Sequence, residues 1–462
     1  MWTSRTANVT VWHATTNGLR MSRHALHALL SFVIAMITAG PGSSTLAQTS
    51  SAEEALVKKA RAIHEKVITL DTHIDFSPGD LVGERNYTQR LETQFNLPNM
   101  IDGGLDALFF SIYVGQTREA QNPDAFKPAG YERAYKLAVE KFDAVLRFTR
   151  EIAPDKIELA LNAADVRRIN AQGKKVALMG VENGYTIGED IARVKEFYDR
   201  GARYLSLTHN GHNQLADSQT GERDGWKWNG LSPLGKQVVG ELNRLGIMVD
   251  VSHASKQSMM QMAALSRAPI IASHSAPRAL CDVSRNMDDE QLLALKRTGG
   301  VIQVFAYSSS IKTTRPDSLD RAAALAAARK EHNLPEPTGP GQRARFQAAL
   351  TQLSADQRAE YEKQLAEIDQ QHPGDPPANL KDFVDHIDYA VRLIGIDHVG
   401  IASDFDGGGG VIGWNDASET FNVTLELVRR GYTEQQIEKL WGGNLLRVMD
   451  AVQRIAGELQ KN

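Results

Sequence analysis

Side chains that commonly bind metals follow several short apolar segments of this chain. Four of its thirteen histidines end such segments, and acidic residues stand in equivalent places. Histidine nitrogens and carboxylate oxygens are ligands that zinc accepts. The pattern therefore suggests a metal site near these ends, whose polar residues are His73, Asp75, Glu182, His209, His253, His274 and Asp404.

The spacing of these residues favours two metal ions rather than one. His73 and Asp75 are two residues apart, so on an extended strand end both side chains point to the same side and can share a cation. His253 and His274 end consecutive segments and could bind a second cation, while Glu182 could bridge the two with its two oxygens. Two zinc ions would activate a bridging water and polarise a carbonyl without a serine or cysteine nucleophile.

Each residue also has a structural interpretation. A single histidine at a strand end is usually a hydrogen-bonded structural residue, but five metal-compatible residues at four strand ends favour metal binding. For Asp71, capping of a turn or support of a neighbouring ligand is the favoured role.

The segments that must position these groups alternate with amphipathic helical patterns, which is typical of parallel βα units. Eight candidate strands predict a closed (β/α)₈ barrel of the TIM type, whose active site forms at the C-terminal ends of the strands. The predicted strands are Val67–His73, Ala107–Val114, Lys175–Glu182, Tyr204–His209, Gly246–His253, Pro269–His274, Gly300–Tyr307 and His398–Asp404.

Helical patterns between the strands predict the outer ring of the barrel. They cover Ile191–Arg200, Leu234–Leu245, Met287–Lys296 and Leu380–Leu393.

A longer segment, about 311–379, interrupts the alternation between the seventh and eighth strands. Prolines divide it into two predicted helices, near Arg321–Glu331 and Arg343–Gln370. We interpret it as a helical insertion. Two interpretations of its role stay open, a lid over the site and solvent-exposed helices with no part in the chemistry.

The N-terminal region has the composition of an export signal. Arg23 and His24 precede an apolar stretch, Ala25–Ala39, and small residues lead to an expected cut after Ala47. Residues 1–47 are predicted to be a leader, with Met21 as an alternative start, and 48–462 a single domain. We expect a periplasmic or extracellular protein without stable membrane insertion, although a retained N-terminal anchor is the alternative.

Composition agrees with a folded enzyme and disfavours some partners. Apolar residues make up 42% and charged residues 23% of the chain, close to the globular average. A net charge of −4 leaves no basic field for nucleic acid. The single cysteine, Cys281, excludes an internal disulfide.

Together these motifs resemble the membrane (renal) dipeptidase family, from about Leu70 to Asn444. The matching segments are Asp71-Thr72-His73-Ile74-Asp75, Gly180-Val181-Glu182, Leu207-Thr208-His209-Asn210, Gly230-Leu231-Ser232-Pro233-Leu234-Gly235, Val249-Asp250-Val251-Ser252-His253, Ser273-His274-Ser275 and Ser403-Asp404-Phe405-Asp406-Gly407. The resemblance implies a zinc dipeptidase that cleaves dipeptides by attack of a metal-bridged hydroxide, and commonly a homodimer.

The resemblance also implies roles for individual residues. The five metal ligands are those that the spacing suggests, with Glu182 as the bridge. His209 would stabilise the developing charge on the scissile carbonyl, and Arg285 would bind the substrate carboxylate. Asp404 would hold the substrate amino group or relay a proton. Tyr307 is a further substrate-binding candidate.

Some features depart from the family pattern, namely Ile74, Asn183, Gly184 and the long insertion, and they leave the shape of the substrate pocket open. Two alternative functions also stay open. One is another metal-dependent amidase or deaminase of the amidohydrolase type, although many of these bridge their metals with a lysine and no lysine ends a strand here. The other is an exported metal-binding protein without turnover.

Overall fold

The structure is a computed structural model that describes residues 41–336, 346 and 349–461. By its internal contacts the chain divides into two units, Met1–Ala55 and Leu56–Asn462, and the barrel lies in the second. Most of the predicted leader, including Met21, lies outside the described residues. Among the helices that the structure does describe, none is both long and apolar enough to cross a membrane.

Eight parallel strands form the barrel, which confirms the predicted fold class. In spatial order they are β1 (Leu70–Ile74), β2 (Ala107–Tyr113), β4 (Lys175–Glu182), β5 (Ala202–Ser206), β6 (Met248–Asp250), β7 (Ile271–Ser275), β8 (Val301–Phe305) and β9 (Val399–Ala402). Nearly every strand residue is buried, because helices cover the outside of the sheet and side chains fill its interior.

The barrel closes between its first and last strands just beyond their ends. A bridge pairs Ile74 with Phe405, the Asp75 amide donates to the Phe405 carbonyl at 2.9 Å, and the Asp404 amide donates to the His73 carbonyl at 3.1 Å. Closure therefore fixes the backbone of two predicted ligand-bearing segments against each other.

Several predicted strands end too late, β5 and β6 by three residues each, and one strand was not predicted. β5 ends at Ser206 and β6 at Asp250, so His209 and His253 lie in the loops that follow. β3 (Ile157–Leu159) pairs only with β4, beside the barrel. Its three residues are too few to give an alternating pattern in the sequence.

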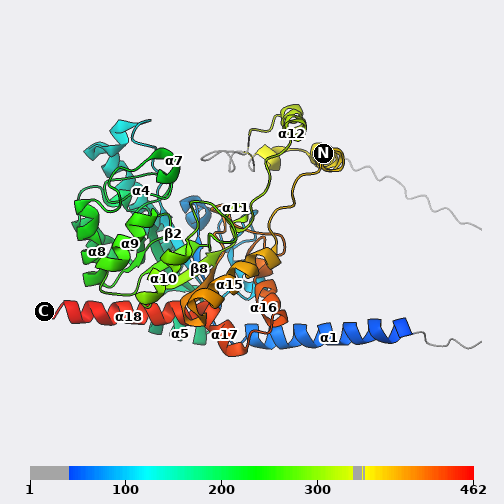
Figure 1. The fold of residues 1–462 in the computed structure, drawn as a ribbon, viewed down its shortest axis with the longest axis horizontal. Coiled ribbons are helices and arrows are strands. Elements are labelled where there is room, and N and C mark those ends of the chain that lie inside the picture. The colour runs from blue at the N-terminus through cyan, green and yellow to red at the C-terminus, as the bar shows by residue number, and fades with distance from the viewer. Residues whose placement is uncertain (1–40, 337–345, 347–348, 462) are drawn as a thin grey trace, which may run out of the picture. The chain divides into compact units, whose positions relative to one another are not determined.

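The four predicted outer helices are present with small shifts in their ends. The described α-helices are α1 (Pro41–His64), α2 (Pro78–Val82), α3 (Leu97–Gly103), α4 (Pro128–Arg147), α5 (Ala163–Ala171), α6 (Ala192–Arg200), α7 (Gly221–Asp224), α8 (Pro233–Leu245), α9 (Lys256–Leu265), α10 (Asp289–Arg297), α11 (Ser308–Ile311), α12 (Leu319–Glu331), α14 (Ala355–Gln371), α15 (Leu380–Ile394), α16 (Thr420–Arg429), α17 (Glu434–Glu438) and α18 (Asn444–Leu459). Figure 1 shows β2 and β8 among helices α8, α9, α10 and α15, and α18 packs against α5 and α8.

The insertion between β8 and β9 contains α12 and α14, which pack against each other. Its small apolar core includes Ala328, Leu334, Tyr361 and Ile368. The second predicted helix ends within one residue of α14, but it is not continuous, because Ser354 and Gln357 form a capping box that begins α14 only at Ala355. Residues 337–345 and 347–348 of the predicted segment lie outside the described part of the chain.

Candidate active site

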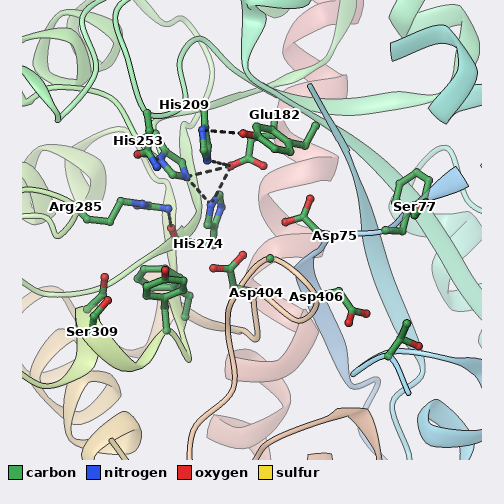
Figure 2. Close-up of a pocket in the computed structure, with 18 of the residues that line it drawn as sticks. Asp75, Ser77, Glu182, His209, His253, His274, Arg285, Ser309, Asp404 and Asp406 are labelled. Carbon is green, nitrogen blue, oxygen red and sulfur yellow. Dashed lines mark hydrogen bonds and ion pairs between the residues drawn. The ribbon is translucent and has the colours of Figure 1, made fainter. Parts of the chain in front are cut away.

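A pocket of about 780 Å³ opens at the C-terminal ends of the barrel strands. Every predicted site residue except His73 lines it, and His73 is fully buried immediately beside Glu182. Figure 2 shows most of the predicted residues, among them Glu182, His253 and Arg285, converging from separate strands and loops. The lining members of the predicted set are Asp75, Glu182, His209, His253, His274, Arg285, Tyr307 and Asp404.

Glu182, the last residue of β4, lies at the centre of the cluster and directs its two oxygens to different partners. Oε2 lies 3.4 Å from Nε2 of His73. Oε1 lies 3.0 Å from Nε2 of His253 and 3.3 Å from Nε2 of His274. Nε2 of His73 is also 3.8 Å from Oδ2 of Asp75. One carboxylate thus connects two groups of potential ligands, as the spacing in the sequence suggests.

The ring of His73 is held from below by Tyr204. Nδ1 of His73 lies 2.9 Å from the Tyr204 hydroxyl, which itself donates to the Thr72 carbonyl at 3.3 Å. That hydroxyl therefore accepts from Nδ1–H, and Nε2 of His73 keeps a free lone pair. The Tyr204 ring fits only because residue 180 is glycine, since a Cβ there would lie 1.9 Å from the ring.

His253 and His274 are oriented in the same manner. Nδ1 of His253 lies 3.3 Å from the side-chain oxygen of Asn210. Nδ1 of His274 lies 2.8 Å from Oγ of Ser273, whose hydroxyl donates to Asp250 at 2.6 Å. Both Nδ1 atoms therefore act as donors, which leaves two Nε2 lone pairs facing each other at 3.0 Å. Such facing lone pairs suit a shared cation.

The charges of the cluster also fit a metal ion. Burial opposes charge on His73, but Tyr204 and Glu182 together hold its pKa well above the usual value, so the surroundings of Nε2 favour a positive charge, which a bound metal ion would supply in place of a proton. Burial and the nearby Arg285 lower the pKa values of His253 and His274, and the charge of His73 adds to the shift of His274. Nε2 of His73 and Oδ1 of Asp75 are buried without a hydrogen-bond partner among the described residues. Three overlapping groups could each bind an ion, namely His73–Asp75–Glu182, Glu182–His253–His274 and His73–His274–Asp404.

His209 lies at the rim of the cluster, with its Nε2 3.8 Å from Oε1 of Glu182. Its Nδ1 lies 3.3 Å from the hydroxyl of Tyr113. Burial lowers the pKa of His209 and raises that of Tyr113, so a neutral imidazole faces a protonated phenol. When the phenol donates to Nδ1, Nε2–H of His209 points into the pocket as a donor.

Arg285 and Asp404 lie on either side of His274. Arg285 donates to Oγ of Ser275 at 2.9 Å and to the His274 carbonyl at 2.6 Å, which fixes the guanidinium at the pocket wall. Burial raises the pKa of Asp404 to about 8 and the nearby His73 opposes this shift. Oδ1 of Asp404 lies 3.9 Å from Nε2 of His73.

Tyr307 lies beside Arg285 in the pocket wall, at the start of α11. Its ring stacks on that of Phe305, with centroids 5.7 Å apart. The guanidinium carbon of Arg285 lies 4.8 Å from the centroid of the same Phe305 ring. Tyr307 is therefore placed where a substrate could reach it.

The membrane dipeptidase family, peptidase family M19, matches residues 57–462. The chain belongs to this family. The resemblance of the sequence motifs to the membrane dipeptidase family is thus confirmed. With it, the assignment of the chain as a metallopeptidase of the dipeptidase type is also confirmed.

Relatives of this dipeptidase agree in sequence and fold. Dipeptidase aclJ of Aspergillus oryzae is 29% identical over 410 residues, which are 86% of this chain and 81% of that protein. The crystal structure of the probable dipeptidase PvdM of Pseudomonas aeruginosa is 35% identical, with a TM-score of 0.70 and coverage of 87% of this chain and 99% of that one. A metallopeptidase of Rhodobacter sphaeroides, solved with a phosphinate mimic of L-Ala-D-Ala, shares the fold at 22% identity and a TM-score of 0.62, over 84% and 99% of the chains.

Several residues of the dipeptidase pocket were not among the predicted ones. Tyr113 pairs in register with Glu182 across β2 and β4, but its position at a strand end gave no signal of contact with His209. Tyr204 and Ser273 act through buried hydrogen bonds that no spacing indicates. Lys141 reaches the pocket from α4. None of the described insertion residues 312–379 lines this pocket.

Proposed function

We propose that the chain is an exported dipeptidase that holds two zinc ions and hydrolyses the single peptide bond of a dipeptide. The observation that supports two ions best is the division of the Glu182 carboxylate, with Oε2 towards His73 and Oε1 towards His253 and His274. Zinc fits because imidazole and carboxylate ligands with free lone pairs face one another. Two zinc ions here would lower the pKa of a shared water and polarise the peptide carbonyl.

The residues of the chain would divide the remaining work. His73 and Asp75 would bind one ion, His253 and His274 the other, with Glu182 between them. Tyr204, Asn210 and Ser273 would hold the three imidazoles in the tautomer that binds metal, because each engages Nδ1.

Around the reacting bond, three residues would act on the substrate. Nε2–H of His209 would donate to the carbonyl oxygen as negative charge develops there. Arg285 would bind the free carboxylate through its planar guanidinium, with Tyr307 beside it. Asp404, whose buried carboxyl holds a proton up to a pKa of about 8, would hold the amino end or pass a proton to the leaving amine.

A metal-dependence assay on a substrate panel tests this function. The purified protein, stripped of metal and then reconstituted with zinc, should release free amino acids from dipeptides only after reconstitution. Cyclic amides and nucleobases in the same panel test the other amidohydrolase activities. Metal analysis should find two zinc ions per chain. Full activity with no more than one zinc per chain would contradict the two-metal site, and bound metal with no turnover would favour the metal-binding alternative.

Export and assembly are separate parts of the proposal. Removal of residues 1–47 would leave a mature N-terminus at or near Gln48, which mass spectrometry of protein from the native host can measure. An intact cytoplasmic chain that retains Arg23–Ala47 would contradict export. A homodimer, supported by the family membership, is tested by light scattering of the mature protein.

A further inference from the structure

A second cationic side chain, Lys141, lines the pocket besides Arg285, and the proposed function gives it no role. Lys141 belongs to α4 and lies on the apolar stripe of that helix, with Ala134, Ala138, Phe142 and Val145. The 3.6-residue period places a buried hydrophobic residue at such a position. The helix therefore directs a lysine inwards where packing alone favours an apolar side chain.

The ammonium of Lys141 has no anionic partner. It lies 4.6 Å from the centroid of the Phe76 ring and 5.9 Å from that of Tyr113. It forms no hydrogen bond or ion pair with any residue that the structure describes. Burial lowers the pKa of Lys141, while Asp75 and Glu182 oppose that shift from beyond contact distance. A half-buried ammonium without a carboxylate costs stability, and attraction to aromatic rings offsets only part of the cost.

Three of the carboxylates that line the pocket with Lys141 have other partners. The two oxygens of Asp406 accept from the backbone amides of Gln94 and Phe95, at 2.9 and 3.1 Å. Asp75 and Glu182 face His73 in the metal cluster. Lys141 is thus left as a donor that points into the pocket without a protein acceptor.

The position of Lys141 relative to Arg285 indicates which part of a bound dipeptide Lys141 would face. Lys141 follows β2 in the chain and Arg285 follows β7, and these two strands are four places apart in the eight-stranded order. Figure 2 shows Arg285 on one side of the histidines, and Asp75 and Ser77, which flank Phe76 in the sequence, on the other. If Arg285 holds the free carboxylate, the N-terminal residue extends towards Lys141.

We propose that Lys141, with the rings of Phe76 and Tyr113, forms a subsite for an acidic side chain on the N-terminal residue of the dipeptide. The proposal rests on the proposed function, because it takes the direction of the substrate from Arg285. The preferred substrates would be dipeptides that begin with glutamate or aspartate.

Two pairs of substrates test the subsite. Each pair differs only in charge, Glu-Ala against Gln-Ala and Ala-Glu against Ala-Gln, in the configuration that the enzyme hydrolyses best. For the zinc enzyme, kcat/KM for Glu-Ala should exceed that for Gln-Ala by about ten- to a hundredfold, the range of one charge-assisted hydrogen bond. Lys141→Met should bring this ratio close to one, and Lys141→Arg should retain most of it.

Matched controls separate the subsite from general effects. Lys136 lies on the same helix, is exposed and pairs with Glu132 at 3.7 Å, so Lys136→Met should keep the wild-type ratio. Lys141→Met should bind the same amount of zinc and should not have a lower Tm, because it removes an unpaired cation from an apolar surface. The Ala-Glu to Ala-Gln ratio should not depend on residue 141.

The possible results test the Lys141 subsite separately from the proposed dipeptidase function. A wild-type ratio near one, or a ratio that survives Lys141→Met, overturns the subsite. A change confined to the Ala-Glu pair overturns its placement at the N-terminal residue. If no dipeptide is hydrolysed, the proposed function fails, and calorimetric binding of L-glutamate against L-glutamine to wild type and Lys141→Met still decides whether Lys141 recognises a carboxylate.

Discussion

The barrel mouth and the insertion between β8 and β9 are built in opposite ways. At the mouth, side chains from β1, β4 and β7 and from the loops after β5, β6 and β9 converge on one carboxylate, Glu182, and nearly all are buried. In the insertion, α12 and α14 pack mainly on each other around a few apolar residues. Buried polar groups are costly unless they are paired or used. The comparison therefore locates the chemistry at the mouth and gives the described part of the insertion no direct contact with it.

The largest expected effect comes from Glu182→Gln. The change keeps the shape of the side chain but removes the charge between the two groups of ligands. We expect kcat/KM for a neutral dipeptide to fall by roughly a thousandfold or more, about 4 kcal/mol. Zinc content, measured on the same preparation, should fall below two ions per chain. An active variant with two tightly bound zinc ions would show that the centre of the mouth is not where we place it.

Removal of the interaction between Arg285 and the substrate carboxylate should have the next largest effect. Arg285→Ala on a free dipeptide, and the wild type on an amidated dipeptide, should each lose about 2–4 kcal/mol, or roughly thirty- to a thousandfold in kcat/KM. The two losses should not add, since both remove one interaction.

Kinetics on the four combinations of enzyme and substrate measure this coupling. Tripeptides should also fail, because a longer chain moves the carboxylate away from Arg285. Equal rates for free and amidated dipeptides would make the enzyme a broader amidohydrolase.

Tyr204→Phe tests the layer of hydrogen bonds beneath the metal cluster. The change removes only the hydroxyl that fixes the tautomer of His73, and such supporting groups typically contribute ten- to a hundredfold in metal affinity. We expect the variant to bind zinc about ten- to a hundredfold more weakly in competition with a chelator. Circular dichroism should show the fold intact. Tyr361→Phe, the same change in the insertion, should leave zinc affinity as in the wild type.

Much of this arrangement could be predicted from residue types at strand ends. His73, Glu182 and His274 belong to β1, β4 and β7, so counting polar residues after apolar runs found them. His209 and His253 were also found, but on predicted strands that extend three residues beyond the observed β5 and β6. The loop after β6 gives His253 a φ of +65°, a conformation that histidine rarely adopts and that no periodicity reveals.

The supporting residues could not be predicted in the same way. Tyr204 reaches His73 across the barrel interior, over 131 positions of sequence, and the space for its ring depends on Gly180. Lys141 is different, since a lysine inside the apolar stripe of α4 is visible in the sequence once the helix is known. The roles assigned to the site residues stay predictions until the variants are measured.

The smallest expected effect comes from the other side of the comparison, the core of the insertion. Tyr361 is buried there against Ala328, Leu334 and Ile368, and its ring meets that of His332 edge to face. Tyr361→Ala should cost about 3–5 kcal/mol of packing, as truncation of a large buried aromatic does. Hydrogen exchange should therefore increase in α12 and α14 but not in β4 or β7. Since no described residue of 312–379 lines the pocket, kcat/KM for a neutral dipeptide should change by less than about twofold, well under 1 kcal/mol. A larger fall in kcat/KM with zinc content unchanged would mean that the insertion closes over the mouth during turnover, and the separation between the two regions would then fail.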